Sequence, residues 1–411
     1  MKNWEGDGMK SLRDLYKIGR GPSSSHTMGP QKAARLFAQA FPEAERHVVT
    51  LYGSLAKTGE GHGTDAVLRE TLAPKEVALR FDRESETPHP NTMDFSAWSG
   101  EEELGAWRVF SVGGGDIRIE EQPAYEAEEV YKLEQFTQIA EYCREKELRL
   151  WQFVEQQEGE GIWDYLEEVW NTMKAAIRAG LAVEGNLPGG LGIQRKARYL
   201  YRQRHIDETP QTRENRLVCS YAFAVSEQNA CCGEIVTAPT CGACAVMPSV
   251  LKYMQETRGC SDREILQALA TGGLMGNLIK TNASISGAEC GCQAEIGSAC
   301  AMAAAALAEL HGMEIDQIEY AAEVALEHHL GLTCDPIGGL VQIPCIERNA
   351  VAAMRAINAL NIANFLTYTR KISFDQVVKT MYGTGRDLAR PYRETSEGGL
   401  AKLMDLEKPH C

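Results

Sequence analysis

The chain has 411 residues, of which 44% are hydrophobic and 24% charged, and its formal net charge is −15. This composition is typical of a folded globular protein of two or three domains, and the acidic balance disfavours a nucleic-acid partner. No apolar run is long enough to span a membrane, and the N-terminus lacks the apolar core of a signal peptide, so we expect a cytoplasmic protein with no membrane partner.

The first segment, residues 9–125, mixes helix and strand patterns. A turn-rich stretch from Gly19 to Thr27 precedes an amphipathic helix expected at residues 31–41. β-branched and aromatic residues predict three strands, at residues 47–53, 77–81 and 107–112. The mixture predicts a small N-terminal α+β domain.

The rest of the chain is dominated by helix patterns. Residues 126–162 are charged and predict a helical connecting segment whose charges face solvent. Residues 163–405 are rich in Ala, Leu, Met and Gly and predict a mostly α-helical large domain with one or two buried central helices, for example at 299–310. Residues 406–411 are a C-terminal tail.

Three of the 13 cysteines lie in glycine- and proline-rich surroundings: Cys292, Cys334 and Cys345. They are widely and unevenly separated along the chain, which is not the compact spacing of a ferredoxin or a zinc ribbon. Such cysteines suit a metal site assembled from separate helix ends or loops, and equally suit buried thiols that only pack. Spacing alone leaves both interpretations open.

Longer motifs carry a resemblance. GRGPSSSHTMGP from Gly19, YGSLAKTGEGHGTDA from Tyr52 and SVGGG from Ser111 resemble the small domain of bacterial iron–sulfur L-serine dehydratases. EGNLPGGLGIQRKA from Glu184, GAECGCQAEIGSACAMAA from Gly287 and LGLTCDPIGGLVQIPCIERNA from Leu330 resemble their large domain. The chain is similar to the single-chain form, in which both domains follow one another. Cys241, Cys244 and Cys290 depart from the family pattern, and we expect them to pack.

The resemblance implies a chemistry and a ligand set. In that family three cysteines hold a [4Fe-4S] cluster with one iron open, and the positions that match are Cys292, Cys334 and Cys345. The open iron is a Lewis acid for the hydroxyl of L-serine, which is converted to pyruvate and ammonia without pyridoxal phosphate. The resemblance also implies a small domain similar to an allosteric substrate-binding domain, a homodimer, and a tail cysteine, Cys411, as a candidate fourth ligand.

The elimination also needs a base and a pocket for the amino acid. His26 and His62 are the candidate bases, with His62 favoured because it lies in a glycine-flanked turn, and neighbouring Thr64 joins the catalytic set. Hydroxyls and turn amides suited to a carboxylate come from Ser23, Ser24, Ser25 and Thr27. Weaker candidates for the pocket are Asn282, Ser284 and Arg348.

Two other classes of function stay open at this level. A related enzyme on the same scaffold, an L-cysteine desulfidase or a threonine dehydratase, would differ in its substrate preference. A non-enzymatic amino-acid sensor would carry a structural metal, such as zinc, at the cysteines.

Overall fold

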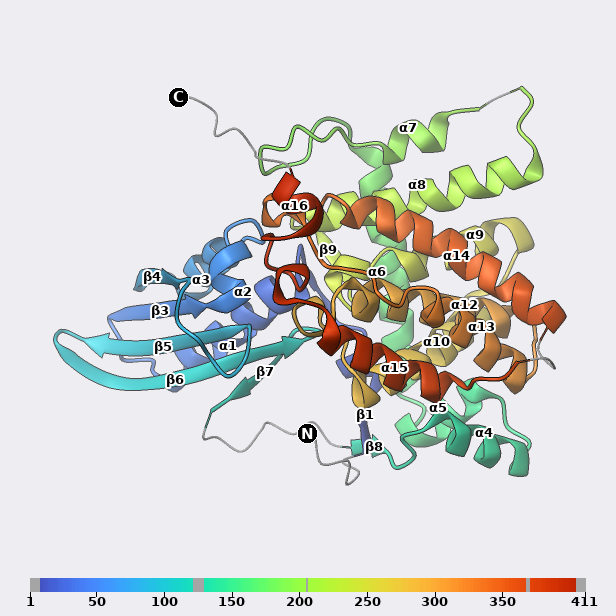
Figure 1. Ribbon diagram of the computed structural model, residues 1–411, viewed down its shortest axis with the longest axis horizontal. Coiled ribbons are helices and arrows are strands. Elements are labelled where there is room, and N and C mark those ends of the chain that lie inside the picture. The colour runs from blue at the N-terminus through green and yellow to red at the C-terminus, as the bar shows by residue number, and fades with distance from the viewer. Residues whose placement is uncertain (1–7, 121–128, 205, 367–369, 404–411) are drawn as a thin grey trace.

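The computed structural model describes residues 8–120, 129–204, 206–366 and 370–403. A sheet-containing part lies on one side of a larger helical body and projects from it (Figure 1). None of the described helices is long and apolar enough to cross a membrane. The architecture confirms the expected α+β N-terminal part and helical large part.

The small part is built on a five-stranded sheet in the order β4-β3-β5-β6-β7. Its strands are β3 (Arg46–Tyr52), β4 (Glu76–Asp82), β5 (Thr92–Ser99), β6 (Glu102–Gly113) and β7 (Asp116–Ile119). β3 and β4 are parallel, and the other pairs are antiparallel. The three strands predicted from the sequence are β3, β4 and the second half of β6.

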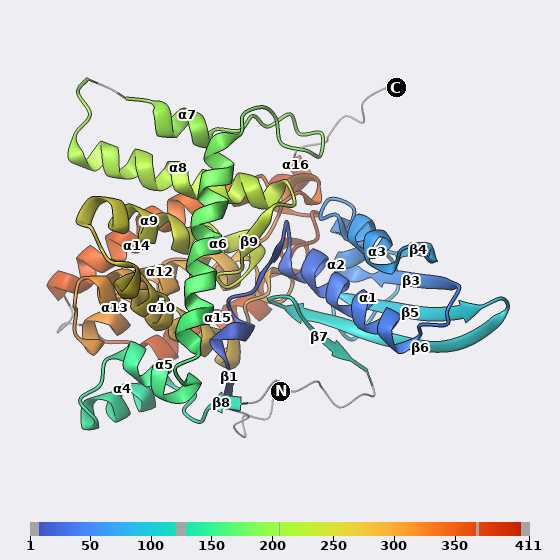
Figure 2. The same ribbon diagram turned by 180° about the vertical axis from the view of Figure 1, so that it is seen from behind.

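Helices α1 (Gly29–Ala40), α2 (Gly53–Thr58) and α3 (Thr64–Leu72) accompany this sheet. α1 and α2 lie in front of the strands in Figure 2, so α1 covers one sheet face. The alternation of β3 sends Val49 and Leu51 inward, where Phe37 of α1 packs with its ring centroid 5.2 Å from that of Phe95. The β-sheet and α1 therefore share one core.

The helical body surrounds one buried helix, α12 (Ser298–Leu310), in which every residue from 298 to 308 is buried. Ala supplies most of that surface, so the neighbouring helices approach closely. This confirms the predicted buried central helix. The other long helices are α6 (Ile162–Ala182), α8 (Pro210–Ala230), α9 (Val246–Arg258), α10 (Asp262–Asn282), α13 (Ile315–Glu327), α14 (Cys345–Leu366) and α15 (Phe374–Asp387).

Shorter elements complete the body and the connection. The connecting segment contains β8 (Glu129–Tyr131), α4 (Phe136–Glu145) and α5 (Leu150–Glu158), with Phe136 and Phe153 buried and the acidic residues of α4 exposed. The remaining elements are α7 (Ala197–Arg202), β9 (Glu234–Val236), η3 (Cys241–Ala243), α11 (Gly287–Cys290), η4 (Gln293–Gly297), η5 (Ile337–Gly339), η7 (Arg390–Tyr392) and α16 (Gly399–Leu403).

The first described residues belong to the helical body. Met9, Leu12, Leu15 and Tyr16 are buried in the same hydrophobic cluster as α10 and α12. They come from β1 (Met9–Lys10), from η1 (Leu12–Asp14) and from the residues just after it, and β1 pairs with β8. The next strand, β2 (Ile18–Arg20), pairs with β9. The chain thus enters the large core before it forms the sheet, a feature that the sequence did not indicate, and the expected domain limits stay a prediction.

A partly buried ion cluster joins the two parts. The carboxylate of Asp116 in β7 accepts hydrogen bonds from Lys17, beside β2, and from Lys280 of α10, the latter at 2.7 Å. All three side chains are less than one-fifth exposed. Burial raises the pKa of Asp116, but the charges of Lys280 and Lys17 outweigh burial and hold this pKa well below its usual range. The sheet is therefore tied to the helical body through ionised groups.

Candidate active site

His26 is held in a turn that opens α1. It lies in η2 (Ser24–Met28), a π-helical turn, and its side chain is fully buried. The hydroxyl of Ser23 accepts a hydrogen bond from the His26 backbone N–H at 3.1 Å, which caps the turn. Turns of this kind occur often at functional sites.

His62 lies on the turn between α2 and α3 and is also buried. The turn approaches η5 so closely that a Cβ on Gly61 would lie 2.7 Å from the carbonyl oxygen of Gly339. Gly63, at the start of α3, has a φ of +66°, a conformation that glycine adopts readily. Glycine at these two positions lets the turn present His62 against the helical body.

Two threonines hold the histidine segments together. The hydroxyl of Thr27 donates to the carbonyl of His62 at 2.8 Å, and the hydroxyl of Thr64 donates to the carbonyl of His26 at 2.5 Å. The two imidazoles stack, with ring centroids 4.5 Å apart and an interplanar angle of 28°. The sequence predicted both histidines and both threonines, and the structure brings all four together.

The hydrogen-bond partners fix which ring nitrogen carries the hydrogen. His62 Nδ1 lies 2.8 Å from the Thr58 carbonyl, which only accepts, so Nδ1 is protonated and Nε2 of the neutral ring has a free lone pair. Ser54 donates its hydrogen to the Glu394 carbonyl, so its oxygen accepts from His26 Nε2–H, at 3.1 Å. His26 Nδ1 then accepts from the Ser25 hydroxyl at 2.8 Å. His62 Nε2 is thus the imidazole nitrogen suited to take a proton.

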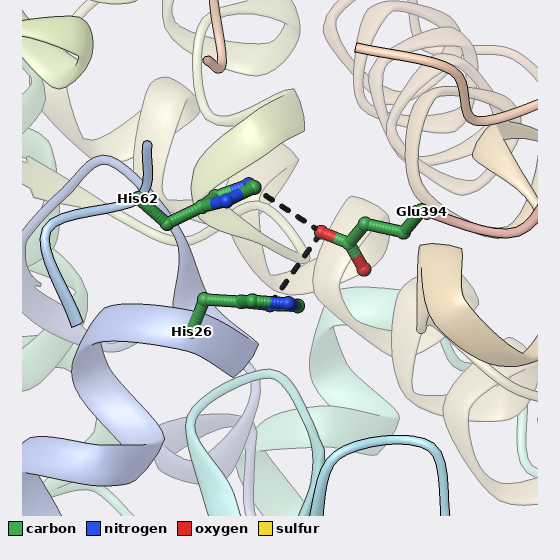
Figure 3. A group of neighbouring side chains, drawn as sticks. All are labelled: His26, His62 and Glu394. Atoms are coloured by element: carbon green, nitrogen blue, oxygen red, sulfur yellow. Dashed lines mark ion pairs between the residues drawn. The ribbon is translucent and has the colours of Figure 1, made fainter. Parts of the chain in front are cut away.

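Glu394 lies beside the two stacked rings, with its carboxyl group facing one nitrogen of each, as Figure 3 shows. Its Oε1 is 3.6 Å from Nδ1 of His26 and 3.7 Å from Nε2 of His62. The residue is buried and has a φ of +55°, which is strained for a side chain of this size. Its backbone N–H donates to the Cys334 carbonyl at 2.9 Å, and this bond helps hold the conformation.

Burial favours the neutral form of each of these three side chains. It lowers the pKa of His62 to about 4 and lowers the pKa of His26 well below 6.5. It raises the pKa of Glu394 to about 8, and the backbone N–H of Ala288 opposes this rise only in part. A buried carboxyl beside two neutral imidazoles therefore lacks a cationic partner among the described residues.

The three predicted cysteine ligands come from three separate turns. Cys292 precedes η4, Cys334 lies in the loop after α13, and Cys345 is the first residue of α14. One ligand atom each of Cys292, Cys334 and Glu295 lies within 4.8 Å of the others. Cys345 is near enough for its charge to interact with Cys292 and with Arg348. The fold therefore gathers thiols that lie far apart in the sequence.

The thiol cluster has the chemistry of a metal site. The hydrogen bond with Cys334 lowers the pKa of Cys292 to about 6 against the opposing effect of burial, and the charge of Arg348 adds to this. Arg348 is held by the Thr333 carbonyl at 2.8 Å and by Asp335 at 3.3 Å. A Cβ on Gly287 would lie 3.1 Å from the Cys334 sulfur, so the glycine keeps space open there. A thiolate-binding metal group fits this donor set.

The cysteines that depart from the family pattern are buried in the structure. Cys241 and Cys244 are fully buried in and after η3, and the sulfur of Cys241 contacts that of Met28 at 3.4 Å. Cys290 is buried beneath Gly385 of α15. These positions agree with packing roles. Cys411 lies outside the described residues.

The remaining predicted pocket residues have defined surroundings. Ser23 and Ser25 hydrogen-bond to His26, whereas the Ser24 side chain is buried beside them. Asn282 donates to the carbonyls of Glu134 and Leu278, and Ser284 donates to the Glu289 carboxylate. A contact of these side chains with an amino acid stays a prediction.

A cavity of about 260 Å³ lies beside residues that contact the histidines. Its lining includes Ser54, which hydrogen-bonds to His26, and Thr395, which follows Glu394. Two arginines, Arg390 and Arg393, also line it and favour an anionic ligand.

Sequence reasoning missed Glu394, Ser54 and Glu295. Glu394 and Glu295 are two of 57 acidic residues, and no spacing links either of them to the histidines. Ser54 lies within the YGSLAKTGEGHGTDA motif, but a lone serine gives no sign of its partner 28 residues earlier. Only the three-dimensional structure shows that these three residues lie at the site.

Comparisons with known proteins identify the family of the chain. A family model described as "Serine dehydratase alpha chain" matches residues 124–401, and "Serine dehydratase beta chain" matches residues 11–73. L-serine dehydratase 1 of Escherichia coli (strain K12) is 40% identical over 96% of this chain and 99% of its own length. L-serine dehydratases of Haemophilus influenzae and Streptomyces coelicolor are 39% and 40% identical, over 96% and 95% of this chain and 99% and 98% of their own lengths. Two family models and relatives aligned over nearly the full length therefore show that the chain belongs to the serine dehydratase family.

Proposed function

We propose that this chain is an L-serine dehydratase that converts L-serine to pyruvate and ammonia with an open-site [4Fe-4S] cluster. One observation carries the proposal: a buried thiol cluster of the helical body lies close to a histidine of the small part that has a free lone pair. Glu394, which hydrogen-bonds to Cys334 and contacts both imidazoles, connects them. Relatives named L-serine dehydratase support the choice of substrate.

The residues that would hold the cluster are Cys292, Cys334 and Cys345. When bound, a cluster with one iron not held by cysteine supplies a Lewis acid for the departing hydroxyl of the amino acid. Cys292, whose pKa is about 6, is the thiol that ionises first at neutral pH. Arg348 faces the same sulfur atoms and offsets the negative charge of the thiolates.

His62 is the base in this proposal. Its Nε2 lone pair takes the α-proton of L-serine, and the C–H electrons form the new double bond as hydroxide leaves Cβ. The product, 2-aminoacrylate, tautomerises and hydrolyses to pyruvate and ammonia. The Thr58 carbonyl keeps the hydrogen on Nδ1, so the lone pair stays on the nitrogen that faces Glu394.

His26 and the two threonines orient this base. His26 uses both ring nitrogens in hydrogen bonds to Ser25 and Ser54, so its lone pair is less available than that of His62. Thr27 and Thr64 fix the distance between the two turns. Arg390 and Arg393 guide the substrate carboxylate through the cavity, and Ser24 is a candidate contact for that group.

The decisive experiment is anaerobic. Protein purified without dioxygen and reconstituted with ferrous iron and sulfide is expected to be brown and to release pyruvate from L-serine, measured with lactate dehydrogenase and NADH. Cys292→Ser should lose colour and activity, whereas Cys219→Ser, at a half-buried thiol bonded to Asn215, should keep both. A colourless, inactive wild-type protein, or one loaded with zinc instead, would reject the proposal.

Substrate preference is measured in the same assay. Rates with L-serine, L-threonine and L-cysteine distinguish the proposed enzyme from a threonine dehydratase or a cysteine desulfidase. The extra methyl group of L-threonine is worth about 1–3 kcal/mol in the relative kcat/KM of the two substrates. A cytoplasmic location and a homodimer stay predictions, and sedimentation of the holoprotein tests the second.

A further inference from the structure

The carboxyl group of Glu394 faces the free lone pair of His62 Nε2 and, at a similar distance, His26 Nδ1, which already accepts from Ser25. His62 Nε2 and His26 Nδ1 lie 3.7 and 3.6 Å from Glu394 Oε1, and the hydrogen bonds above leave neither nitrogen with a hydrogen to donate toward it (Figure 3). Two acceptors without a donor, Glu394 Oε1 and His62 Nε2, therefore face each other. Acceptors arranged in this way repel one another unless a proton or a cation lies between them.

Glu394 also has an unused oxygen. Its Oε2 is buried and accepts no well-formed hydrogen bond from the described residues, although the Ala288 backbone N–H lies near the carboxyl. A buried carboxylate oxygen without a donor is unfavourable, so the ionised form of Glu394 suits a ligand that brings N–H donors. The Glu394 backbone is fixed by Cys334 on one side and by Ser54 on the other, so the carboxylate does not reach this position by chance.

The other buried carboxylates near the thiols already have partners. Asp335 binds Arg348 through one oxygen and the Leu400 N–H through the other, at 3.3 and 2.7 Å. Glu295 accepts from the Thr240 hydroxyl at 2.8 Å, and its second oxygen lies 3.9 Å from the Cys292 sulfur. Glu394 is the carboxylate that lies against the histidines, next to residues that line the cavity.

We propose that Glu394 binds the α-ammonium group of the substrate. The proposal rests on the proposed function and adds a recognition residue to it. An ammonium group offers three N–H donors, and two of them suit the two oxygens of Glu394. Because Cα is one bond from the nitrogen, an ammonium held here brings the α-hydrogen toward His62 Nε2. The same carboxylate would select amino acids over hydroxy acids.

The test compares two ligands that differ only at this group. L-serine carries the ammonium, whereas L-glycerate keeps the carboxylate and the β-hydroxyl but has a hydroxyl in its place. In the holoenzyme, Glu394→Gln should raise the KM of L-serine by about ten- to a hundredfold, the range for one charged hydrogen bond. The inhibition constant of L-glycerate should stay within about threefold, and the visible spectrum should be unchanged.

Two further variants complete the design. Glu394→Asp keeps the charge and should recover part of the loss in KM. Glu397→Gln changes a half-exposed glutamate in the same segment, bonded to Lys57, and should leave both constants unchanged. Where a variant turns over too slowly, calorimetry gives the dissociation constants of both ligands directly.

Three outcomes would overturn the proposal. One is an equal weakening of L-serine and L-glycerate, which indicates a structural role. Another is an unchanged KM of L-serine with a lower kcat. The third is a tightly held non-iron metal ion that Glu394→Gln removes. Absence of pyruvate release by wild-type holoprotein would instead reject the proposed function, and the calorimetric comparison of the two ligands would still report on Glu394.

Discussion

Replacement of Asp116 by asparagine should weaken the attachment of the sheet to the helical body. The substitution keeps the shape of the side chain but leaves the ammonium groups of Lys17 and Lys280 together without a counter-charge. Their side chains are 16% and 18% exposed, so water screens them only in part. Removal of one partner from a buried ion pair costs about 3–5 kcal/mol, and partial exposure places this case near about 3 kcal/mol.

The measurement is urea unfolding of the holoprotein under argon at pH 7, followed by circular dichroism. A control is Asp94→Asn, which breaks a pair with Arg108 on side chains that are 30% and 36% exposed. That pair is solvent-screened, so its loss should cost about 1 kcal/mol or less. The Asp116 variant should therefore unfold at a clearly lower urea concentration than the control.

The dependence on pH has a definite sign. The folded pKa of Asp116 is depressed, so its contribution is complete above the unfolded value of about 3.9 and is lost as the pH falls through the folded value. Burial lowers the pKa of Lys17 to about 8, so the cluster also weakens above that pH. The gap between wild type and variant should be largest between about pH 5 and 7.5. Equal stabilities at pH 7, or a gap that widens below pH 4, would refute the reasoning.

Three further predictions concern the base, the metal and the packing. His62→Asn should lower kcat/KM by about 10²–10⁴ and keep the brown colour. In the wild type, kcat/KM should fall on the acid side near pH 4, because protonation of His62 removes the base. A fall centred near pH 6.5 would contradict the effect of burial on the pKa of His62. An iron chelator with a reductant should bleach the protein and stop pyruvate release, and both should return with ferrous iron and sulfide, whereas activity that survives bleaching would argue against the metal. Gly180→Ala should lower stability by about 1–3 kcal/mol in thermal unfolding, because its Cβ would lie 2.1 Å from the Ala224 carbonyl oxygen, while an unchanged melting temperature would show that α6 and α8 can separate.

The fold class and the residues of the motifs could be predicted from the sequence. Strands such as β3 alternate buried and half-buried residues with a period of two, and α12 is a run of small apolar residues, so local patterns specify both. His26, His62 and the cysteines lie in long motifs, and those motifs place them on turns beside helices. In each of these cases the information lies in neighbouring residues.

The features that local patterns do not encode are the contacts between distant segments. Glu394 reaches the histidines through backbone hydrogen bonds with Cys334 and Ser54, both of which lie much earlier in the chain. The sequence pattern assigns Met9 and Leu12 to the start of the small domain, but they pack against helices from the second half of the chain. The hydroxyls of Thr27 and Thr64 donate to the carbonyl oxygens of the opposite histidines, and no local pattern indicates these contacts. Their expected roles toward substrate and in catalysis stay predictions.

The packing of residues 9–16 against helices from the second half of the chain has a consequence for synthesis on the ribosome. The hydroxyl of Tyr16 donates to the carbonyl of Leu269, 253 residues further along the chain. At roughly 5–20 residues per second, this apolar segment leaves the ribosome about 13–50 s before its partner helix has been made. During that interval Leu12, Leu15 and Tyr16 have no core to join, which makes the nascent N-terminus a binding site for chaperones and a starting point for aggregation when expression is fast.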